Sequence, residues 1–299
     1  MTDSGGAAIS IRALHAWDEL QAAEELQRRV WQMPDWRDAV PGNLLTAVGK
    51  SGGTVLGAFA ADGKLVGLAF SFIGLDTHAE PAKLKHHSHM VAVLPEFRSQ
   101  GIGIQLKFKQ REEALAQHID LMTWTYDPLQ ALNANLNLVH LGAIARRYIV
   151  NAYGEMTDGL NAGVASDRFE VEWWLNAPRV KGCAAGQALE FRWHDLARAG
   201  ARQVFQVQID PRGIPHIEHE NELRGERLLI EIPANVGAVK TASLGLAREW
   251  RVRTREMFQR AFAAGYAAIG FVFANQEEHR RAAYVLAREL PQMDELHSG

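Results

Sequence analysis

A strand that stops at a proline, followed by a glycine-rich turn and an amphipathic helix, occupies residues 86–119. The strand covers residues 86–93, and Pro95 ends it because proline cannot donate a hydrogen bond to a ladder. From Gly101 onward, apolar residues recur at helical spacing on an otherwise polar segment. A strand that feeds such a turn directs several unpaired N–H groups to one point, where the helix dipole adds positive potential. This order predicts an anion-binding turn.

The glycines at positions 101 and 103 suit a phosphate ligand. Without Cβ atoms, Gly101 and Gly103 let a pyrophosphate approach the backbone. A turn alone would also explain a bare Gly-x-Gly pair, but here a strand, a proline and a helix surround it. The Gly-x-Gly-x-x-Gly pattern of dinucleotide-binding folds is absent, because position 106 is Leu, and the Walker pattern is missing too. We therefore expect a phosphate site of another kind.

The remaining pattern up to residue 176 alternates strands with helices. Asp62-Gly63 predicts a tight hairpin between two of the strands. The other predicted strands cover residues 8–14, 54–60, 65–73, 120–126, 147–151 and 169–175, and predicted helices cover residues 20–30, 43–48 and 129–141. This order predicts an α/β (α+β) fold with a mixed, mostly antiparallel sheet flanked by helices.

A second unit is predicted after Leu175, where Pro178, Gly182 and Gly186 mark a boundary. Its predicted elements are strands at residues 204–209, 228–232 and 268–273 and an arginine-rich helix at residues 247–264. We therefore expect two domains, residues 1–176 and a smaller C-terminal α/β subdomain of residues 177–299.

Composition excludes several classes of protein. The net charge of -3 argues against a nucleic-acid partner despite the arginines near the C-terminus. We interpret those arginines as a solvated helix or an interdomain contact. A single cysteine, Cys183, excludes an intramolecular disulfide framework and a thiolate-rich metal cluster. Neither a signal peptide nor a membrane-spanning run is predicted, so we expect a cytoplasmic protein with no membrane partner.

The stretch from residue 90 to residue 106 resembles the acyl-CoA-binding motif of the GNAT acyltransferases, in which a strand leads to Arg/Gln-x-x-Gly-x-Gly/Ala and a helix. The order of predicted elements resembles the GNAT order over residues 8–176. The resemblance implies two strands that splay apart, with the pantetheine arm bonding the backbone of Val91, Ala92 and Val93. It implies that the pyrophosphate is held by Arg98, Ser99, Gln100, Gly101, Ile102, Gly103 and Ile104.

Two asparagines lie on the next predicted helix. Asn133 and Asn137 are spaced i, i+4 and so share one face of that helix. The resemblance implies that one of them bonds the pantetheine or another part of the coenzyme. The alternative is that Asn137 satisfies a nearby loop carbonyl.

The general acid of many GNAT enzymes has no counterpart here. It is a tyrosine four residues before the glycine that ends this helix, and the position is Leu138 in this chain. The candidates to replace it are Tyr126, Tyr148 and Tyr153, of which Tyr126 is our first choice.

Acyl transfer to an amine also needs a base and donors for the tetrahedral oxyanion. His87 and His89 alternate onto one face of the motif strand, and we choose His89 as the candidate base. An ordinary hydrogen-bonded histidine is the alternative. Asp127 is a second candidate base, although a helix N-cap before Pro128 would also explain it. No third ligand accompanies the two histidines, so we expect no metal.

Residues 166–175 and 231–233, with Trp250-Arg251-x-Arg253, resemble a GNAT subfamily with a C-terminal extension. Some members of that subfamily are thought to succinylate amino acids. The resemblance implies that Arg146, Arg147 or Arg168 pairs with a carboxylate of the acyl group or the acceptor. Ordinary ion pairs are the alternative.

Together these features predict an acyltransferase that moves an acetyl or succinyl group from acyl-CoA, its cosubstrate, to a primary amine of a small molecule, with an amino acid among the candidates. The alternative is a GNAT-fold protein without catalysis that binds acyl-CoA or another ligand as a sensor or interaction module. The extension leaves three roles open: a lid, a homodimer interface or part of the acceptor pocket.

Overall fold

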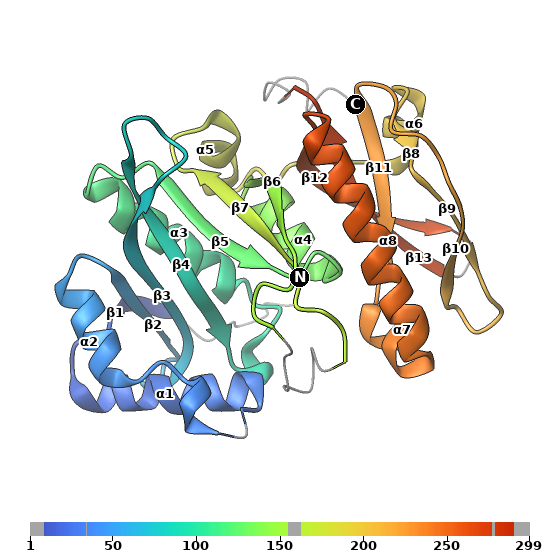
Figure 1. Cartoon of the computed structure of the whole chain (residues 1–299). Coiled ribbons are helices and arrows are strands. Elements are labelled where there is room, and N and C mark those ends of the chain that lie inside the picture. The colour runs from blue at the N-terminus through green and yellow to red at the C-terminus, as the bar shows by residue number, and fades with distance from the viewer. Residues whose placement is uncertain (1–8, 34, 155–162, 277–278, 290–299) are drawn as a thin grey trace, which may run out of the picture. The chain divides into compact units, whose positions relative to one another are not determined.

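The computed structural model of the chain describes residues 9–33, 35–154, 163–276 and 279–289 (Figure 1). Residue 8, where the first strand was expected to begin, lies outside the described residues. By its internal contacts the chain divides into two compact units, residues 1–124 and 125–299. The division falls within strand β5 (Leu121–Tyr126), whereas the sequence predicted a boundary near residue 176. None of the described helices is both long and apolar enough to span a membrane.

The first unit is a sheet with helices on its faces. Its strands follow the order β1-β2-β3-β4-β5, antiparallel throughout except for the parallel pair β4–β5, which confirms the predicted mixed, mostly antiparallel sheet. Its elements before β5 are β1 (Ser10–Ala13), α1 (Trp17–Trp31), η1 (Trp36–Asp38), α2 (Gly42–Lys50), β2 (Thr54–Phe59), β3 (Leu65–Asp76), β4 (Lys83–Val93), η2 (Pro95–Phe97) and α3 (Ile102–Ala116).

The β2–β3 hairpin forms where Asp-Gly predicted it. Gly63 has a φ of 81°, a conformation that glycine adopts without the strain of a Cβ atom. The Asp62 carboxylate accepts a hydrogen bond from the Lys64 amide at 3.0 Å and closes the turn. Local turn chemistry thus sets the register of these two strands.

The core of the first unit joins helix side chains to the sheet. Leu20 and Leu26 of α1 pack in the same buried cluster as Leu68 of β3 and Leu106 of α3. Helix α3 lies close against β3 at Gly67. A Cβ atom added there would lie 3.1 Å from the Leu106 side chain. This packing fixes the start of α3, and with it the glycine-rich turn, relative to β4.

The second unit contains a six-stranded sheet in the order β7-β6-β12-β13-β11-β8 and a separate β9–β10 hairpin. Its elements after β5 are α4 (Ala131–Asn135), the π-helical turn η3 (Leu136–His140), β6 (Ile144–Ile149), β7 (Arg168–Trp174), α5 (Pro178–Ala184), α6 (Trp193–Arg198), β8 (Arg202–Gln203), β9 (Phe205–Ile209), β10 (Pro215–Glu220), β11 (Arg227–Ile232), α7 (Val236–Ala242), α8 (Leu244–Ala263), β12 (Ala267–Gln276) and β13 (His279–Ala287).

An aromatic cluster ties the later elements to the earlier ones within this unit. The Phe169 ring of β7 lies 4.7 Å from Phe258 of α8 and 5.3 Å from Tyr284 of β13, measured between centroids. All three side chains are fully buried. Residues on both sides of position 176 therefore share one core. For this reason the chain divides by its contacts after residue 124 and not near residue 176.

Candidate functional site

The glycine-rich turn opens α3 with unpaired amides. Gly101 is the N-cap and has a φ of 75°, and no side chain caps the helix. The Gln105 amide donates to the Gly101 carbonyl at 3.0 Å. In the described part of the chain, no carbonyl or side chain accepts a hydrogen bond from the amides of residues 101–104. These N–H groups are available to an anion at the positive end of the helix dipole.

Nothing in the described part of the chain explains why position 103 is glycine. Its backbone is helical, so the conformation does not require glycine. A Cβ atom there would have only Val93 Cγ2 within 4.0 Å, so packing does not require glycine either. Glycine costs helix stability, and its presence in open space beside free amides fits the close approach of a ligand.

The neighbouring turn residues are exposed. Ser99, with a φ of 63°, and Gln100 both face solvent. The Arg98 guanidinium donates from Nε to the Val93 carbonyl at 3.3 Å, which places its charge beside the end of β4. A cation there would add to the positive potential of the helix start.

Strand β4 carries a bulge at His89. Met90 pairs with Phe70 and Ser88 pairs with Ser71, so His89 is the extra residue on β4. Bulges increase the local twist and interrupt pairing. On the other side of β4, the parallel pairing with β5 is recorded at His86 and His87 and at no residue of the described strand beyond them. The pairing of the two strands therefore ends before the bulge.

The three histidines of β4 have different surroundings. The rings of His87 and His89 lie 5.2 and 6.3 Å from the Phe72 ring, which confirms that they share a face. His86 lies on the opposite face, fully buried, with Nδ1 3.0 Å from the Ser71 hydroxyl. The pKa of His89 lies below its ordinary value of 6.5, because protein atoms displace water that would solvate the imidazolium. Its ring is therefore neutral at physiological pH. Among the described residues, no group of three potential ligands is placed to hold a metal.

A buried lysine packs against the sheet of the first unit, and its burial was not predicted from the sequence. Lys107 of α3 is 3% exposed, and its ammonium lies 3.6 Å from the centre of the Trp124 ring and 3.3 Å from Gln110 Oε1. Gln110 accepts in turn from the Ser88 hydroxyl at 2.9 Å. Burial holds the pKa of Lys107 well below its ordinary value. A lysine in an otherwise polar helical segment is expected to face solvent, and only the contact with Trp124 of another element reveals its burial.

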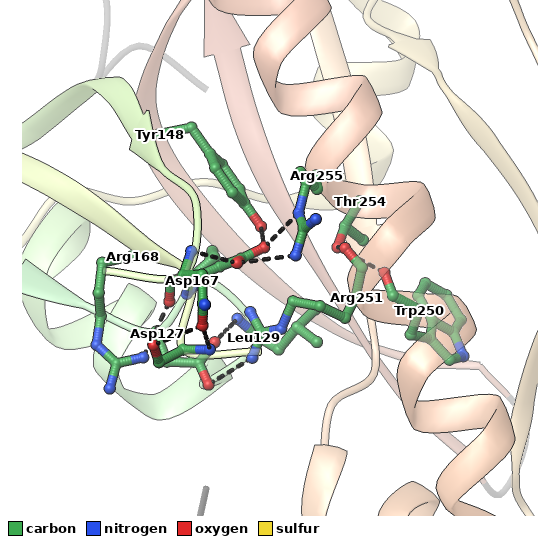
Figure 2. Close-up of polar contacts among 12 residues, drawn as sticks. Asp127, Leu129, Tyr148, Asp167, Arg168, Trp250, Arg251, Thr254 and Arg255 are labelled. Atoms are coloured by element: carbon green, nitrogen blue, oxygen red, sulfur yellow. Dashed lines mark hydrogen bonds and ion pairs between the residues drawn. The ribbon is translucent and has the colours of Figure 1, made fainter. Parts of the chain in front are cut away.

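Asp127 is engaged on both oxygens, as Figure 2 shows. Its Oδ2 accepts from Arg251 Nη2 at 2.7 Å, and its Oδ1 accepts from the Leu129 amide at 2.8 Å. Asp127 is 9% exposed and Arg251 is 4% exposed. The N-cap of α4 is Gln130, so Asp127 stabilises the preceding turn instead of capping the helix. These contacts favour a structural role for Asp127.

A second carboxylate, Asp167, accepts four hydrogen bonds. Arg255 donates to both of its oxygens, at 2.8 and 2.9 Å, and the Tyr148 hydroxyl donates at 2.7 Å (Figure 2). The fourth donor is the Asn151 amide at 2.9 Å. Arg168 donates from Nη1 to the Asp167 backbone carbonyl at 2.9 Å. The Tyr148 hydroxyl, one candidate acid, is thus held inside this network.

The pairing of the α8 arginines with these carboxylates was not predicted from the sequence. Arg251 and Arg255 are four residues apart and share one face of the helix, a spacing that could have suggested a common contact. Their partners, Asp127 and Asp167, are distant in sequence, so the pairing itself was not visible. The prediction that these arginines lie on a solvated helix face is wrong for Arg251, which is buried.

The other candidate acids differ in exposure. The Tyr126 hydroxyl donates to Tyr284 at 3.2 Å, and burial raises the pKa of Tyr126. Tyr153 is exposed, with its hydroxyl 2.9 Å from Thr125 Oγ1. Leu138, at the position of the usual tyrosine, is fully buried. Of the three candidate tyrosines, Tyr153 is the most exposed residue.

The two asparagines predicted to share a helix face differ in exposure and in backbone conformation. Asn133 is exposed on α4, whereas Asn137 is buried in the π-helical turn η3. A π-helical turn changes the spacing of side chains, so the α-helical rule that placed both residues on one face does not apply. Their role toward a coenzyme stays a prediction.

The arginines of β6 pair with glutamates of β7. Arg146 Nη1 lies 3.0 Å from Glu172 Oε2, and Arg147 Nη1 lies 2.8 Å from Glu170 Oε2. Ion pairs across neighbouring strands were the alternative to a substrate contact. The substrate role of Arg146 and Arg168 stays a prediction.

No family model and no curated protein matches the chain. Several solved structures are similar to it. The ribosomal-protein-S18-alanine N-acetyltransferase from Escherichia coli is 16% identical with a TM-score of 0.43, covering 55% of this chain and 92% of that one. A putative acetyltransferase from Salmonella typhimurium, solved with its cofactor acetyl-CoA, is 19% identical with a TM-score of 0.45, covering 57% and 95%.

A GNAT family N-acetyltransferase from Escherichia coli, in complex with CoA, is 17% identical with a TM-score of 0.35, covering 43% of this chain and 68% of that one. Such likenesses concern the fold and identify neither an activity nor a substrate. The first two of these structures cover 55% and 57% of this chain, so part of the chain has no counterpart in them.

Proposed function

We propose that the chain is a GNAT-type acyl-CoA N-acyltransferase whose coenzyme pyrophosphate binds at the start of α3. The observation that carries the proposal is the set of unpaired amides at residues 101–104, together with a glycine at position 103 that no contact among the described residues requires. A diphosphate satisfies both features, because it accepts several hydrogen bonds and needs close approach to the backbone.

The parted strands supply a place for the pantetheine arm. Alternate residues of an antiparallel strand direct their N–H and C=O groups away from the partner, so part of the backbone of residues 91–93 faces away from β3. Beyond His87, no described residue of β4 pairs with β5. We assign these groups to the pantetheine and, through an amide, to the oxyanion of the tetrahedral intermediate.

The reaction that fits this arrangement is acyl transfer to a neutral amine. The amine nitrogen attacks the thioester carbonyl, the C–S bond breaks, and the coenzyme leaves as a thiolate that takes up a proton. His89 is the proposed acceptor of the amine proton, because its lowered pKa keeps the imidazole neutral. The proposed acyl group is acetyl or succinyl, and the proposed acceptor is a small primary amine, with an amino acid as the first class to test.

A second candidate is a protein that binds acyl-CoA without catalysis. Leu138 stands where many GNAT enzymes have the acidic tyrosine, and the hydroxyls of Tyr126 and Tyr148 are committed inside the protein. Thiol release from acetyl-CoA and succinyl-CoA, measured against a panel of amines and amino acids, distinguishes the two candidates. Turnover above the uncatalysed rate excludes the binding protein, and coenzyme binding without turnover on the whole panel excludes the enzyme.

A further inference from the structure

A cavity of about 460 Å³ lies within the second unit, and all of its described lining residues belong to that unit. Its size falls in the range of small-molecule sites. Its walls are residues 129–132, residues 213–215 after β9, the end of β11 with the start of α7, and the first arginines of β13. Apolar side chains dominate the described lining, among them Leu132, Ile214 and Val236.

Helix α8 holds two of these walls in place. Arg251 binds Asp127, whose other oxygen accepts from Leu129 in the first wall (Figure 2). The preceding residue, Trp250, donates from Nε1 to the Pro215 carbonyl of the second wall at 2.9 Å. Two consecutive residues of one helix thus fix both sides, so the cavity is a built feature of the fold.

Three charged side chains line the cavity in its described part, namely Glu231, Arg280 and Arg281. Arg281 binds Glu231 through two nitrogens, so these two charges compensate each other. Arg280 stacks its guanidinium on the Phe273 ring, 3.7 Å from the ring centre. Stacking occupies the face of a guanidinium and leaves its N–H groups directed outward in the plane, where they can bind an anion.

We propose that this cavity binds a small molecule with an anionic group on an apolar body. Arg280 receives the anionic group, and the apolar walls cover the body. Leu132 supports this occupant, because it lines the cavity and is 72% exposed, which a bound apolar group would reduce. The proposal is independent of acyl-CoA binding, since it uses none of the residues assigned to the coenzyme.

The test is calorimetric titration of the full-length chain with decanoate below its micelle concentration. Decanol and decylammonium share the same chain and carry no charge and a positive charge, respectively. We expect saturable one-to-one binding of decanoate, about tenfold weaker binding of decanol, and the weakest binding of decylammonium. Absence of decanoate binding, or equal affinities for the three probes, overturns the proposal.

Two variant pairs locate the site. Arg280→Ala should weaken decanoate binding about tenfold, whereas Arg198→Ala removes an exposed arginine that does not line the cavity and should have no effect. Ala238→Phe adds bulk at an exposed lining position of α7, and Ala242→Phe adds it to the same helix outside the lining. Decanoate affinity that falls equally in both members of each pair, or in neither, contradicts the assignment.

Discussion

Replacing Gly103 with alanine separates a phosphate site from a simple turn. The position is helical, and a new Cβ atom would have only Val93 Cγ2 within 4.0 Å. The protein itself therefore tolerates the methyl group. In a helix the Cα–Cβ bond tilts toward the N-terminus, so this methyl group points toward the free amides and the anion that they would bind.

The two effects should have opposite signs. Glycine to alanine in a helix, at a compatible conformation, raises the free energy of unfolding by about 0.5–1 kcal/mol. Displacing the diphosphate from one amide costs about 1.5–3 kcal/mol, the value of a hydrogen bond to a charged group. That loss corresponds to roughly 10- to 100-fold weaker binding of CoA.

Urea unfolding and calorimetric titration with CoA measure the two quantities. Gly49→Ala is the matched control, because Gly49 lies in helix α2 and its new Cβ would meet only Val55 Cγ2, at 3.9 Å. Both variants should be more stable than the wild type, and only Gly103→Ala should lose CoA affinity. A Gly103→Ala variant that gains stability and keeps its affinity would refute the assignment of the turn.

Three further changes test other groups. His89→Gln should remove the acidic limb of the pH–rate profile, which the lowered pKa of His89 places below pH 6.5, and an unchanged profile excludes His89 as the base. Lys107→Met should stabilise the protein at pH 7 by about 1 kcal/mol. Because the folded-state pKa of Lys107 is depressed, the free energy of unfolding of the wild type should rise with pH from that lowered pKa up to 10.5. Urea unfolding at several pH values measures this rise, and the same pH dependence in Lys107→Met would contradict the assignment. Arg251→Met leaves Asp127 buried without its cation and should lower the free energy of unfolding by about 3–5 kcal/mol, and a loss below about 1 kcal/mol would contradict a tightly buried pair.

Local chemistry made the first unit predictable. The Asp62-Gly63 turn, the proline after β4 and the glycines before α3 each act within a few residues, so the hairpin and the strand–turn–helix were readable in the sequence. The bulge at His89 was not, because it depends on pairing with Phe70 and Ser71, which belong to another strand. The end of the β4–β5 pairing was predicted from the resemblance alone.

Tertiary pairing decided the elements that the sequence did not reveal. Strand β13 contains Ala282, Ala283 and Leu286, residues that favour helices, yet it pairs with β12 on one side and β11 on the other. Burial between two strands outweighs such weak local preferences. The ion pair of Arg251 with Asp127 spans 124 residues and was beyond any local rule.

The central claim is that the amides at the start of α3 bind the diphosphate of coenzyme A. The most direct measurement is calorimetric titration of the wild-type chain with CoA and, in parallel, with pantetheine, which lacks the diphosphate. We predict saturable one-to-one binding of CoA that weakens as salt is raised, and much weaker binding of pantetheine. Absence of CoA binding at millimolar concentration, or equal affinities for the two compounds, would contradict the claim.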